Sequence, residues 1–558
     1  MWMLLISLVL AVFTPDAPPD AAYSLTLLSG PQVRVSLQVT GTSTGTTELR
    51  LQPHWGGIEN DGGDVTALKV TDSKGSELTI EHPGTTQWKV THQPSEPLTV
   101  SYIIPARELK PLLRGNDYRT RLEPGLFHMI GELGLILPEH FDNETLRAFS
   151  IAFHGFDQDG GSIVSSFGNG PGPFTLQRSG QDVRHTVILA GKVRTLTRKV
   201  NGNTVGIAIV GNEWGFNDDD LADLTARIIA TERDFWNDHT DPWFLVTLTP
   251  TGTDAHSFSI GGTGLTDSFA LFCNTGLTLD EASPRAMQVK RLLAHEYFHT
   301  WNGGKIKSAG EEGAGYWFSE GFTDFYARRL LHSSGMFSDA VYLDQLNEML
   351  GQAAGNPARN APASRVNNEF WKNQDVQKLP YQRGDQVALA VDERVREVSK
   401  GTRSIDDLMK SLLEKSRSGE PYSSELVLKL IESETDVAFA AAIRSAVVDG
   451  SEIPLPASIT TPRATLAKGK SRSFDAGFDI DASRKSKTLT GVRPGTAAHD
   501  AGLRDGQTLK GLSISSGTPE APPFAKVTID SEGASKEITY DPLTPPIEVP
   551  RYIAKKSQ

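Results

Sequence analysis

Hydrophobic and polar residues alternate through the first third of the chain. The clearest run is 33–39, in which aliphatic residues alternate with polar ones. Similar short runs recur at 88–90, 100–104, 149–153, 187–189 and 205–209, with Gly, Pro, Asn and Asp between them. A period of two predicts β-strands, and many short strands separated by turn residues favour an antiparallel sandwich or open barrel. We therefore predict an N-terminal β-sandwich-like domain over residues 23–213.

The spacing of hydrophobic residues changes after Asn217. Leu221, Leu224 and Ile228 repeat every three or four residues, which is the period of an amphipathic helix. Most of the chain from Ser283 to Val448 follows the same period. We expect a mostly helical domain over residues 214–452.

Short strands and glycine turns return near the C-terminus. Residues 453–470 contain prolines with Lys, Arg and Ser, a composition typical of a linker. Residues 471–558 then predict a small β domain. At about 100–200 residues per domain, 558 residues are enough for three domains. The expected fold class is therefore multidomain α+β.

The chain begins with an apolar run, Trp2–Phe13, interrupted only by Ser7. A run of this length is too short for a transmembrane helix, which needs about 20 residues, and it suits the core of a signal peptide. We expect a signal peptide over residues 1–22, an exported protein and no transmembrane helix. A buried first strand in a cytoplasmic protein is the alternative, because no Lys or Arg precedes the run.

Charge and cysteine content limit the chemistry. The chain has 55 Lys and Arg against 68 Asp and Glu, a net charge of −13, which argues against nucleic-acid binding because phosphate contacts need clustered basic residues. Cys273 is the single cysteine, so neither an intramolecular disulfide nor a cysteine-rich zinc site can form. Any bound metal must be held by His, Asp or Glu.

The segment HEYFH (295–299) lies near the end of a predicted helix that starts at Ser283. His295 and His299 are four residues apart, so their imidazoles share one helix face and can share one ion. Glu296 is turned about 100° away, the usual position of the general base in this motif. A solvated helix end with two surface histidines is the alternative interpretation.

A second helix is predicted around Trp317–Tyr326. Glu320 can complete the three protein ligands that a catalytic zinc requires. Asp324 lies one turn later on the same face, where it can accept a hydrogen bond from the second N–H of a ligating imidazole. Both could instead be ordinary polar positions, but the aromatic residues around them argue against this.

The segments HEYFHTWN (295–302) and WFSEGFTDFY (317–326) resemble the glycyl-aminopeptidase family of gluzincin zinc peptidases. The resemblance implies a β domain, a thermolysin-like catalytic domain and a C-terminal PDZ domain, the order in which the three regions occur. It also implies one Zn²⁺ per chain, held by His295, His299 and Glu320. The implied activity is hydrolysis of a peptide or protein substrate by metal-activated water, with Glu296 as general base.

Tyr381 precedes Gly384 at the start of another predicted helix. The family has a Tyr two to three residues before a Gly at this place, and related gluzincins use a Tyr hydroxyl to stabilise the tetrahedral intermediate. The resemblance therefore makes Tyr381 the candidate oxyanion donor. The alternative is a packed Tyr whose hydroxyl meets water.

An aminopeptidase must also bind the substrate's ammonium group, usually with a carboxylate near the metal. The family often has Gly-Gly-Leu-Glu-His ahead of the zinc-binding helix, whereas Thr266 and Asp267 stand in place of Glu-His here. Asp267 could supply the carboxylate, although a shift of one residue on a strand changes its face. The resemblance favours an aminopeptidase acting on small N-terminal residues, and an endopeptidase is the alternative.

The segments 473–480, 491–498 and 501–506 resemble a PDZ domain. Gly477 and Phe478 would form its carboxylate-binding loop, whose backbone N–H groups hold a chain terminus while the neighbouring strand adds the peptide. The expected partner is then a C-terminal peptide. The alternative is a degenerate PDZ domain that only packs on the catalytic domain.

Two other functions fit parts of the sequence. A non-catalytic PDZ-containing peptide-binding protein would need a broken site, but both histidines, Glu296 and Glu320 are present. Hydrolysis of an epoxide or ester is the other possibility, because a fold alone does not determine the reaction.

Overall fold

The computed structural model describes residues 18–60, 62–106, 118–251, 259–280, 283–310, 312–515, 517, 522–531 and 533–555. The apolar core of the predicted signal peptide, Trp2–Phe13, lies outside these residues. Within them, the structure has no helix with both the length and the hydropathy needed to cross a bilayer.

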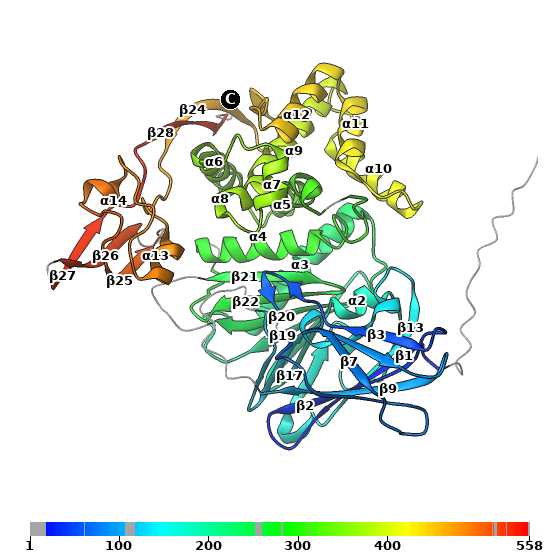
Figure 1. The fold of residues 1–558 in the computed structure, drawn as a ribbon. Helices are drawn as coiled ribbons and strands as arrows, with labels where there is room; N and C mark the ends of the chain where they lie inside the picture. The colour runs from blue at the N-terminus through cyan, green and yellow to red at the C-terminus, as the bar shows by residue number, and fades with distance from the viewer. Residues whose placement is uncertain are drawn as a thin grey trace, which may run out of the picture.

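The N-terminal part forms three sheets around one hydrophobic core (Figure 1). The predicted alternation is confirmed in β2 (Gln32–Thr40), whose aliphatic side chains are buried at every second position. β2 pairs antiparallel with β1 (Ala21–Leu27) on one side and β9 (Pro97–Pro105) on the other. Since β1 begins at Ala21, this region starts two residues before the predicted boundary at 23.

The other elements of this part are short. The strands are β3 (Thr46–Arg50), β4 (His54–Trp55), β5 (Ile58–Glu59), β6 (Thr66–Thr71), β7 (Ile80–Gly84), β8 (Gln87–Thr91), β10 (Arg121–Glu123), β11 (Leu126–Ile130), β12 (Leu137–Pro138), β13 (Arg147–His154), β14 (Ser162–Ser165), β15 (Gly168–Asn169), β16 (Phe174–Arg178) and β17 (Val187–Gly191). The helical turns are α1 (Gly131–Gly134), η1 (Glu139–Phe141), η2 (Gln158–Gly160) and α2 (Gly180–Arg184). The sheet orders are β16-β13-β1-β2-β9-β6, β10-β11-β17-β14-β15 and β12-β3-β8-β7, and β4 and β5 form a separate hairpin.

A fourth sheet lies between this region and the helices (Figure 1). Its strands are β18 (Val193–Val200), β19 (Asn203–Val210), β20 (Trp243–Thr251), β21 (Ile260–Leu265) and β22 (Ser268–Asn274), in the order β18-β19-β20-β22-β21. β19, β20 and β22 are parallel to one another, and β21 is an antiparallel edge strand.

This sheet corrects the predicted domain boundary at residue 213. β18 and β19 belong to the sheet that carries the helices, so the change of sheet falls near Lys192. In β19, Ile207 and Ile209 join the core shared with the helices, whereas Ala208 and Val210 join a core shared with the N-terminal strands. Because β19 is buried on both faces, its hydrophobic pattern does not indicate which domain it belongs to.

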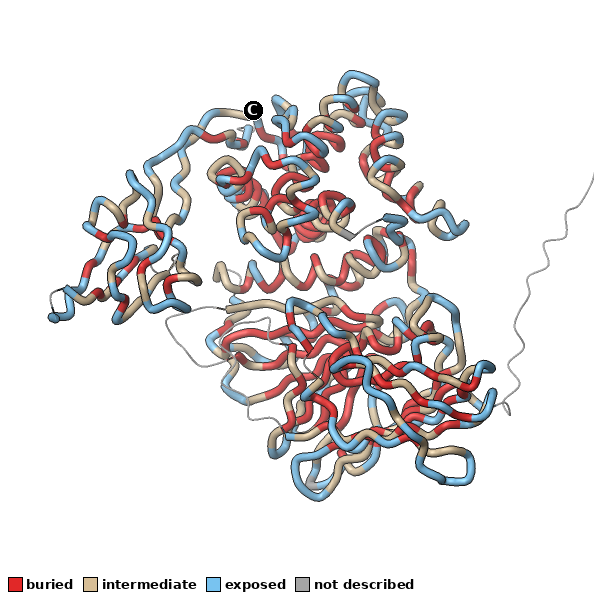
Figure 2. The backbone as a smooth tube through the Cα atoms, in the orientation of Figure 1, coloured by how far each residue is buried: buried red, intermediate tan, exposed pale blue. Residues whose placement is uncertain are grey.

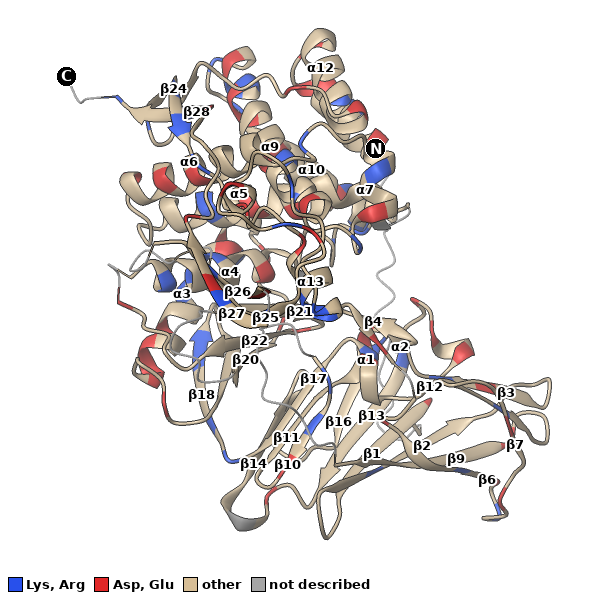
Figure 3. Ribbon diagram, turned by 60° about the vertical axis from the view of Figure 1, so that its left-hand side comes forward, with Lys and Arg blue, Asp and Glu red and all other residues tan. Residues whose placement is uncertain are grey.

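The helices cover the upper face of the fourth sheet in Figure 1. They are α3 (Asp218–Trp236), α4 (Pro284–Phe298), η3 (Glu312–Gly315), α5 (Tyr316–Ser333), α6 (Asp339–Gly355), α7 (Ala363–Glu369), α8 (Gln374–Gln377), α9 (Leu379–Val398), α10 (Ile405–Arg417), α11 (Ser424–Glu434) and α12 (Val437–Asp449). α3 and α4 lie on the sheet, and α5 and α9 lie above α4. Buried residues concentrate in these layers (Figure 2), and charged residues of both signs are spread over the helices (Figure 3).

The C-terminal residues form a small module with its own core, attached by two strands (Figure 1). Its elements are β23 (Ser458–Ile459), β24 (Ala464–Ser471), α13 (Ile480–Ser486), α14 (Ala497–Asp500), β25 (Leu509–Ser515), β26 (Phe524–Ser531), β27 (Ala534–Tyr540) and β28 (Ile547–Ala554). The predicted linker 453–470 is wrong in part, because β23 and most of β24 fall within it and pair with β28. Tyr552 anchors β28 to the helical domain. Its backbone exchanges two hydrogen bonds with the side chain of Asn347 in α6, and its ring joins the helical core.

The predicted carboxylate-binding loop, Gly477 and Phe478, is followed by a helix and not by a strand. Gly477 has a left-handed φ of 82°, as a turn requires, and Phe478 is buried in the core of the module. The residues that follow form helix α13, capped by the Asp479 side chain, where strand addition would need a strand edge. The arrangement around Gly477 and Phe478 therefore lends no support to capture of a C-terminal peptide at this loop.

Candidate active site

His295, His299 and Glu320 converge on one point. His295 lies in the last turn of α4, His299 caps its C-terminus, and Glu320 lies in the second turn of α5. The two Nε2 atoms are 3.1 Å apart, and Glu320 Oε2 is 3.3 Å from His295 Nε2 and 3.5 Å from His299 Nε2. Among the described residues, these three form the group whose ligand atoms could hold a metal ion.

The spacing of these atoms fits zinc. Tetrahedral zinc with bonds of about 2.0–2.1 Å keeps its ligand atoms about 3.3 Å apart. Both imidazoles also have the required tautomer available, because His295 Nδ1 lies 2.9 Å from Asp324 Oδ1 and His299 Nδ1 lies 2.9 Å from the Asn302 carbonyl oxygen. When each Nδ1 donates to its acceptor, both Nε2 lone pairs face Glu320 Oε2. A cation satisfies this arrangement of three acceptors.

Asp324 orients His295 and is itself held by Arg291, whose Nη2 lies 2.8 Å from Asp324 Oδ2. Burial raises the pKa of the Asp324 carboxyl, but Arg291 and His295 outweigh it and hold this pKa well below its usual range. For His295, burial lowers the pKa, and hydrogen bonds to Asp324 and Glu320 raise it well above the usual value. Asp324 therefore stays ionised and keeps its hydrogen bond to the imidazole.

Asn302 ties the end of α4 to α5. Its carbonyl oxygen accepts the His299 hydrogen bond, and its fully buried side-chain amide donates to the carbonyl oxygens of Phe318 and Ser319 and to Thr323 Oγ1, at 3.1–3.2 Å. The orientation of one histidine is thus coupled to the helix that carries Glu320.

Glu296 lies on a different face of α4 from the two histidines and contacts the edge strand β21. Its Oε2 accepts a hydrogen bond of 2.9 Å from the Gly264 N–H. Burial raises the pKa of the Glu296 carboxyl, and the opposing effects of His295 and His299 are smaller. A carboxylate with a raised pKa suits a group that accepts a proton and then releases it.

Tyr381 lies in the first turn of α9 and faces the metal group. Its ring centroid is 6.0 Å from that of His295, with the two planes 27° apart. Burial, followed by the charges of Glu320 and Glu296, raises the pKa of the Tyr381 phenol well above its usual value. The hydroxyl therefore keeps its proton and remains a hydrogen-bond donor.

Two glycines set the position of Tyr381 relative to Glu320. A Cβ atom on Gly384 would lie 1.8 Å from the Trp317 carbonyl oxygen, and one on Gly321 would lie 2.2 Å from Gly384 Cα. Helices α5 and α9 therefore pack backbone against backbone at this point. Glu320 precedes Gly321 and Tyr381 lies one turn before Gly384, so this close approach brings both to the metal group.

A buried ion pair holds the same two helices together. Arg328 of α5 makes two hydrogen bonds of 2.5 and 2.6 Å to Asp385 of α9, and both side chains are at most 1% exposed. Such a pair resists separation of the helices, because removing one partner would leave the other charge buried without compensation.

Asp267 does not join this group. It lies in the turn between β21 and β22, with φ at 52°, and its Oδ2 is 2.5 Å from Nη2 of Arg178 in β16. Burial raises the pKa of the Asp267 carboxyl, and Arg178 opposes this effect. The structure thus argues against the predicted role of Asp267, because a carboxylate already paired with Arg178 is a poor partner for a substrate ammonium. The turn directs its side chain to the N-terminal domain.

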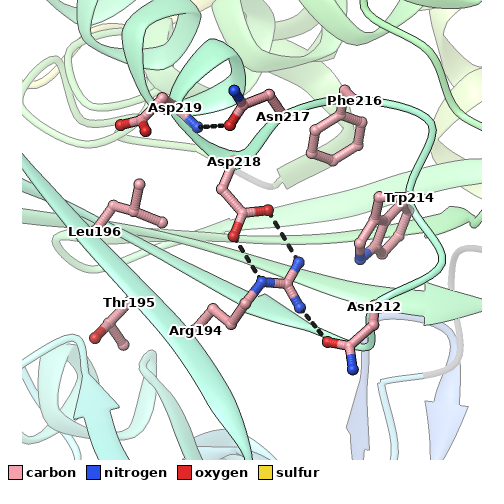
Figure 4. A pocket seen from close by; sticks show the side chains of 9 residues that line it. All are labelled: Arg194, Thr195, Leu196, Asn212, Trp214, Phe216, Asn217, Asp218 and Asp219. Carbon is pink, nitrogen blue, oxygen red and sulfur yellow. Dashed lines mark hydrogen bonds and ion pairs between the residues drawn. The ribbon is translucent and has the colours of Figure 1, made fainter.

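A surface cavity of about 570 Å³ lies elsewhere, at the start of α3 (Figure 4). Arg194 crosses it and bonds to both carboxylate oxygens of Asp218, at 2.6 and 2.9 Å, and Trp214 and Phe216 line one side. None of the residues lining this cavity belongs to the metal group. Asp219 pairs with Arg198, which lies outside the lining, so each charged residue of the lining already has a partner of opposite charge.

Sequence reasoning missed Arg291, Asn302 and Gly264. Arg291 could have been found, because it lies four residues before His295 and so on the same helix face. Asn302 enters the sequence analysis only as the last residue of HEYFHTWN, and the direction of its side chain depends on how the chain folds back on α5. The contact of Gly264 depends on the register of β21, which no local pattern reveals.

Comparisons with known proteins find similarity to peptidases. Residues 288–384, from α4 to Gly384, match the model of the M61 glycyl aminopeptidase family. No curated protein matches the sequence closely enough to be counted as a relative.

The fold is shared with solved aminopeptidase-like structures. An aminopeptidase N family protein from Idiomarina loihiensis matches with a TM-score of 0.72 at 16% identity, over 94% of this chain and 96% of that one. An M1 zinc metallopeptidase variant from Deinococcus radiodurans, bound to a Tyr-Ser-Ala substrate, matches with a TM-score of 0.51 at 16% identity, over 78% of this chain and 95% of that one. The family match and the His–His–Glu group together support a zinc metallopeptidase, on a fold similar to that of the aminopeptidase N-like proteins.

Proposed function

We propose that this chain hydrolyses peptide bonds as an aminopeptidase, with His295, His299 and Glu320 holding one zinc ion. The observation that carries the proposal is the convergence of three ligand atoms within 3.1–3.5 Å of one another. Glu296 stands beside this group on the same helix, which suits a proton carrier next to a metal.

Each residue has a role that follows from its charge. When bound, zinc supplies a Lewis acid that lowers the pKa of water and polarises a carbonyl group. Glu296 accepts a proton from the attacking water and delivers it to the leaving amine. Tyr381 donates a hydrogen bond to the carbonyl oxygen as negative charge develops on it. Asp324 keeps His295 in the tautomer that binds metal.

The position of cleavage remains the point to test. The descriptions of the matching family and of the structural neighbours favour removal of single N-terminal residues. Endopeptidase action is the second candidate, because the carboxylate predicted to bind the ammonium, Asp267, pairs with Arg178 instead. The partner in either case is a peptide or protein. We further propose an exported protein, on the basis of the apolar run Trp2–Phe13.

Digestion of a mixed peptide library by zinc-loaded protein tests the proposal, with products read by mass spectrometry. We expect sequential loss of single N-terminal residues, and no products from a Glu296→Gln variant that still binds zinc. Internal cleavage would replace the aminopeptidase with an endopeptidase. Intact peptides after incubation with protein containing one zinc per chain would refute peptide hydrolysis altogether.

A further inference from the structure

Among the described residues, β21 is an edge strand, and it contacts α4. Alternate residues of an edge strand direct their N–H and C=O groups away from the sheet. In β21 these include Gly262 and Gly264. The Gly264 N–H donates to Glu296 Oε2 at 2.9 Å, and the Gly262 carbonyl oxygen accepts from the Tyr118 hydroxyl at 2.8 Å. Two adjacent outward positions therefore connect Glu296 to Tyr118.

Tyr118 belongs to the N-terminal part of the chain and is rigidly held. Its ring packs edge-on against Trp55 of the β4–β5 hairpin, with centroids 5.4 Å apart, and against Phe272 of β22 at 5.6 Å. A Cβ atom on Gly56 would lie 2.7 Å from the ring, so the hairpin backbone also fits closely around it. Tyr118 is only 7% exposed, which makes its hydroxyl a structural donor rather than a substrate contact.

The contact between Gly264 and the Glu296 carboxylate is also close. A Cβ atom on Gly264 would lie 3.3 Å from Glu296 Oε2, a tight contact that would push the carboxylate away by a few tenths of an ångström. Tyr118 is also near enough for the Glu296 charge, together with the larger effect of burial, to raise the pKa of its phenol. A displacement of β21 would therefore move the carboxylate of Glu296.

We propose that Tyr118 is a positioning residue for Glu296, acting through the backbone of β21. The N-terminal β-rich region then takes part in catalysis by fixing the strand against which the carboxylate rests. This inference rests on the proposed function, in which Glu296 moves the proton. Displacing a catalytic group by about 1 Å can cost about 100-fold in rate. A hydrogen bond that fixes the strand can therefore affect kcat.

A different result is expected if the Tyr118 hydrogen bond only stabilises the contact between the two regions. Loss of the Tyr118 hydroxyl would then lower thermal stability and leave the turnover of the remaining folded enzyme unchanged. The split between kcat and KM separates the two possibilities, because a misplaced proton carrier slows the chemical step without weakening substrate binding.

The test replaces Tyr118 by Phe in the full chain, with Tyr23→Phe as the matched control. Tyr23 is also buried in the N-terminal part and donates to a backbone carbonyl, that of Ile136, at 2.7 Å. We expect Tyr118→Phe to lower kcat about fivefold or more, with KM and zinc content within about twofold of the parent. Tyr23→Phe should leave kcat unchanged.

A second variant approaches the same contact from the strand. Gly264→Ala should lower kcat by pushing the carboxylate away, and its control is Gly84→Ala, whose Cβ would lie 3.4 Å from Gln87 Oε1 on an exposed strand. The Tyr118→Phe and Gly264→Ala effects should not multiply in the double variant, because both act on one carboxylate.

The outcomes are distinct. An unchanged kcat in Tyr118→Phe, an equal loss in Tyr23→Phe, or a change confined to KM would overturn the inference while leaving the proposed function intact. Multiplying effects in the double variant would show that Tyr118 does not act through Gly264 and Glu296. Absence of peptidase activity in the zinc-loaded parent would instead refute the proposed function.

Discussion

Helix α4 carries the two histidines on one face and Glu296 on another, and the residues that orient them come from different parts of the chain. His295 and His299 are oriented by partners close to them in the helical region: Asp324 with Arg291, and Asn302. Glu296 instead contacts a backbone N–H of the edge strand β21, which is bonded in turn to Tyr118 of the N-terminal region. The residues that orient the metal ligands thus all lie in the helical region, whereas the contacts of the proposed base Glu296 extend through β21 to the N-terminal region.

This difference suggests that zinc affinity and turnover can be changed separately. Substitutions among the supports of the histidines should change metal binding first. Substitutions that face the substrate, or that hold Glu296, should change kcat at constant zinc content. Three substitutions test this separation: Tyr381→Phe, Asp324→Asn and Asp267→Asn.

Tyr381→Phe should lower kcat by about 100- to 1,000-fold, the usual cost of removing one oxyanion donor. Zinc content should remain that of the parent, because the Tyr381 hydroxyl is not a ligand. Steady-state kinetics with metal analysis checks both quantities. Tyr552→Phe, which loses a 2.7 Å hydrogen bond to the Pro456 carbonyl in the C-terminal attachment, serves as the control. Loss of zinc in Tyr381→Phe would contradict the separation of roles.

Asp324→Asn should weaken zinc binding by about 10- to 100-fold, the usual effect of removing a hydrogen-bonding partner of a ligating histidine. Competition with a chelator of known affinity measures the change. Asp339→Asn is the matched control, because Asp339 also bonds to a histidine of α5, His332, at 2.7 Å but at the far end of the helix. Unchanged zinc affinity in Asp324→Asn would show that the orientation of His295 does not depend on this carboxylate.

Asp267→Asn should change kcat/KM by less than about threefold, because Asp267 pairs with Arg178 and not with the metal group. The pair is partly exposed, so its loss should also cost little folding stability. The comparison to make is between peptides with a free and an acetylated N-terminus. A large rise in KM confined to peptides with a free N-terminus would restore Asp267 as the ammonium ligand, against the geometry described above.

The sequence was most informative where function depends on local spacing. The i, i+4 pair His295 and His299, and the one-turn step from Glu320 to Asp324, follow from helix geometry alone. The buried alternation of β2 was likewise readable, because one face of that strand meets the core and the other is exposed or half-buried. Cys273, the single cysteine, is fully buried in the core shared with the helices, and burial raises the pKa of its thiol to about 12.

Features that depend on distant segments were not readable. β19 is buried on both faces, so its pattern could not place the domain boundary. Asp267 is turned away by a hairpin whose partner, Arg178, lies far along the chain. The helix after Phe478 shows the same limit, because a short polar segment can form a strand or a helix until its neighbours decide.

The most direct test of the account is titration of the metal-free chain with zinc, with peptidase activity followed at each step. Activity should rise in proportion to bound zinc and reach its maximum at one ion per chain, because His295, His299 and Glu320 form a single site. Glu320→Gln should bind zinc far more weakly, and Glu296→Gln should bind it normally without activity. Full activity in the metal-free chain, or zinc binding that survives the loss of Glu320 undiminished, would contradict the account.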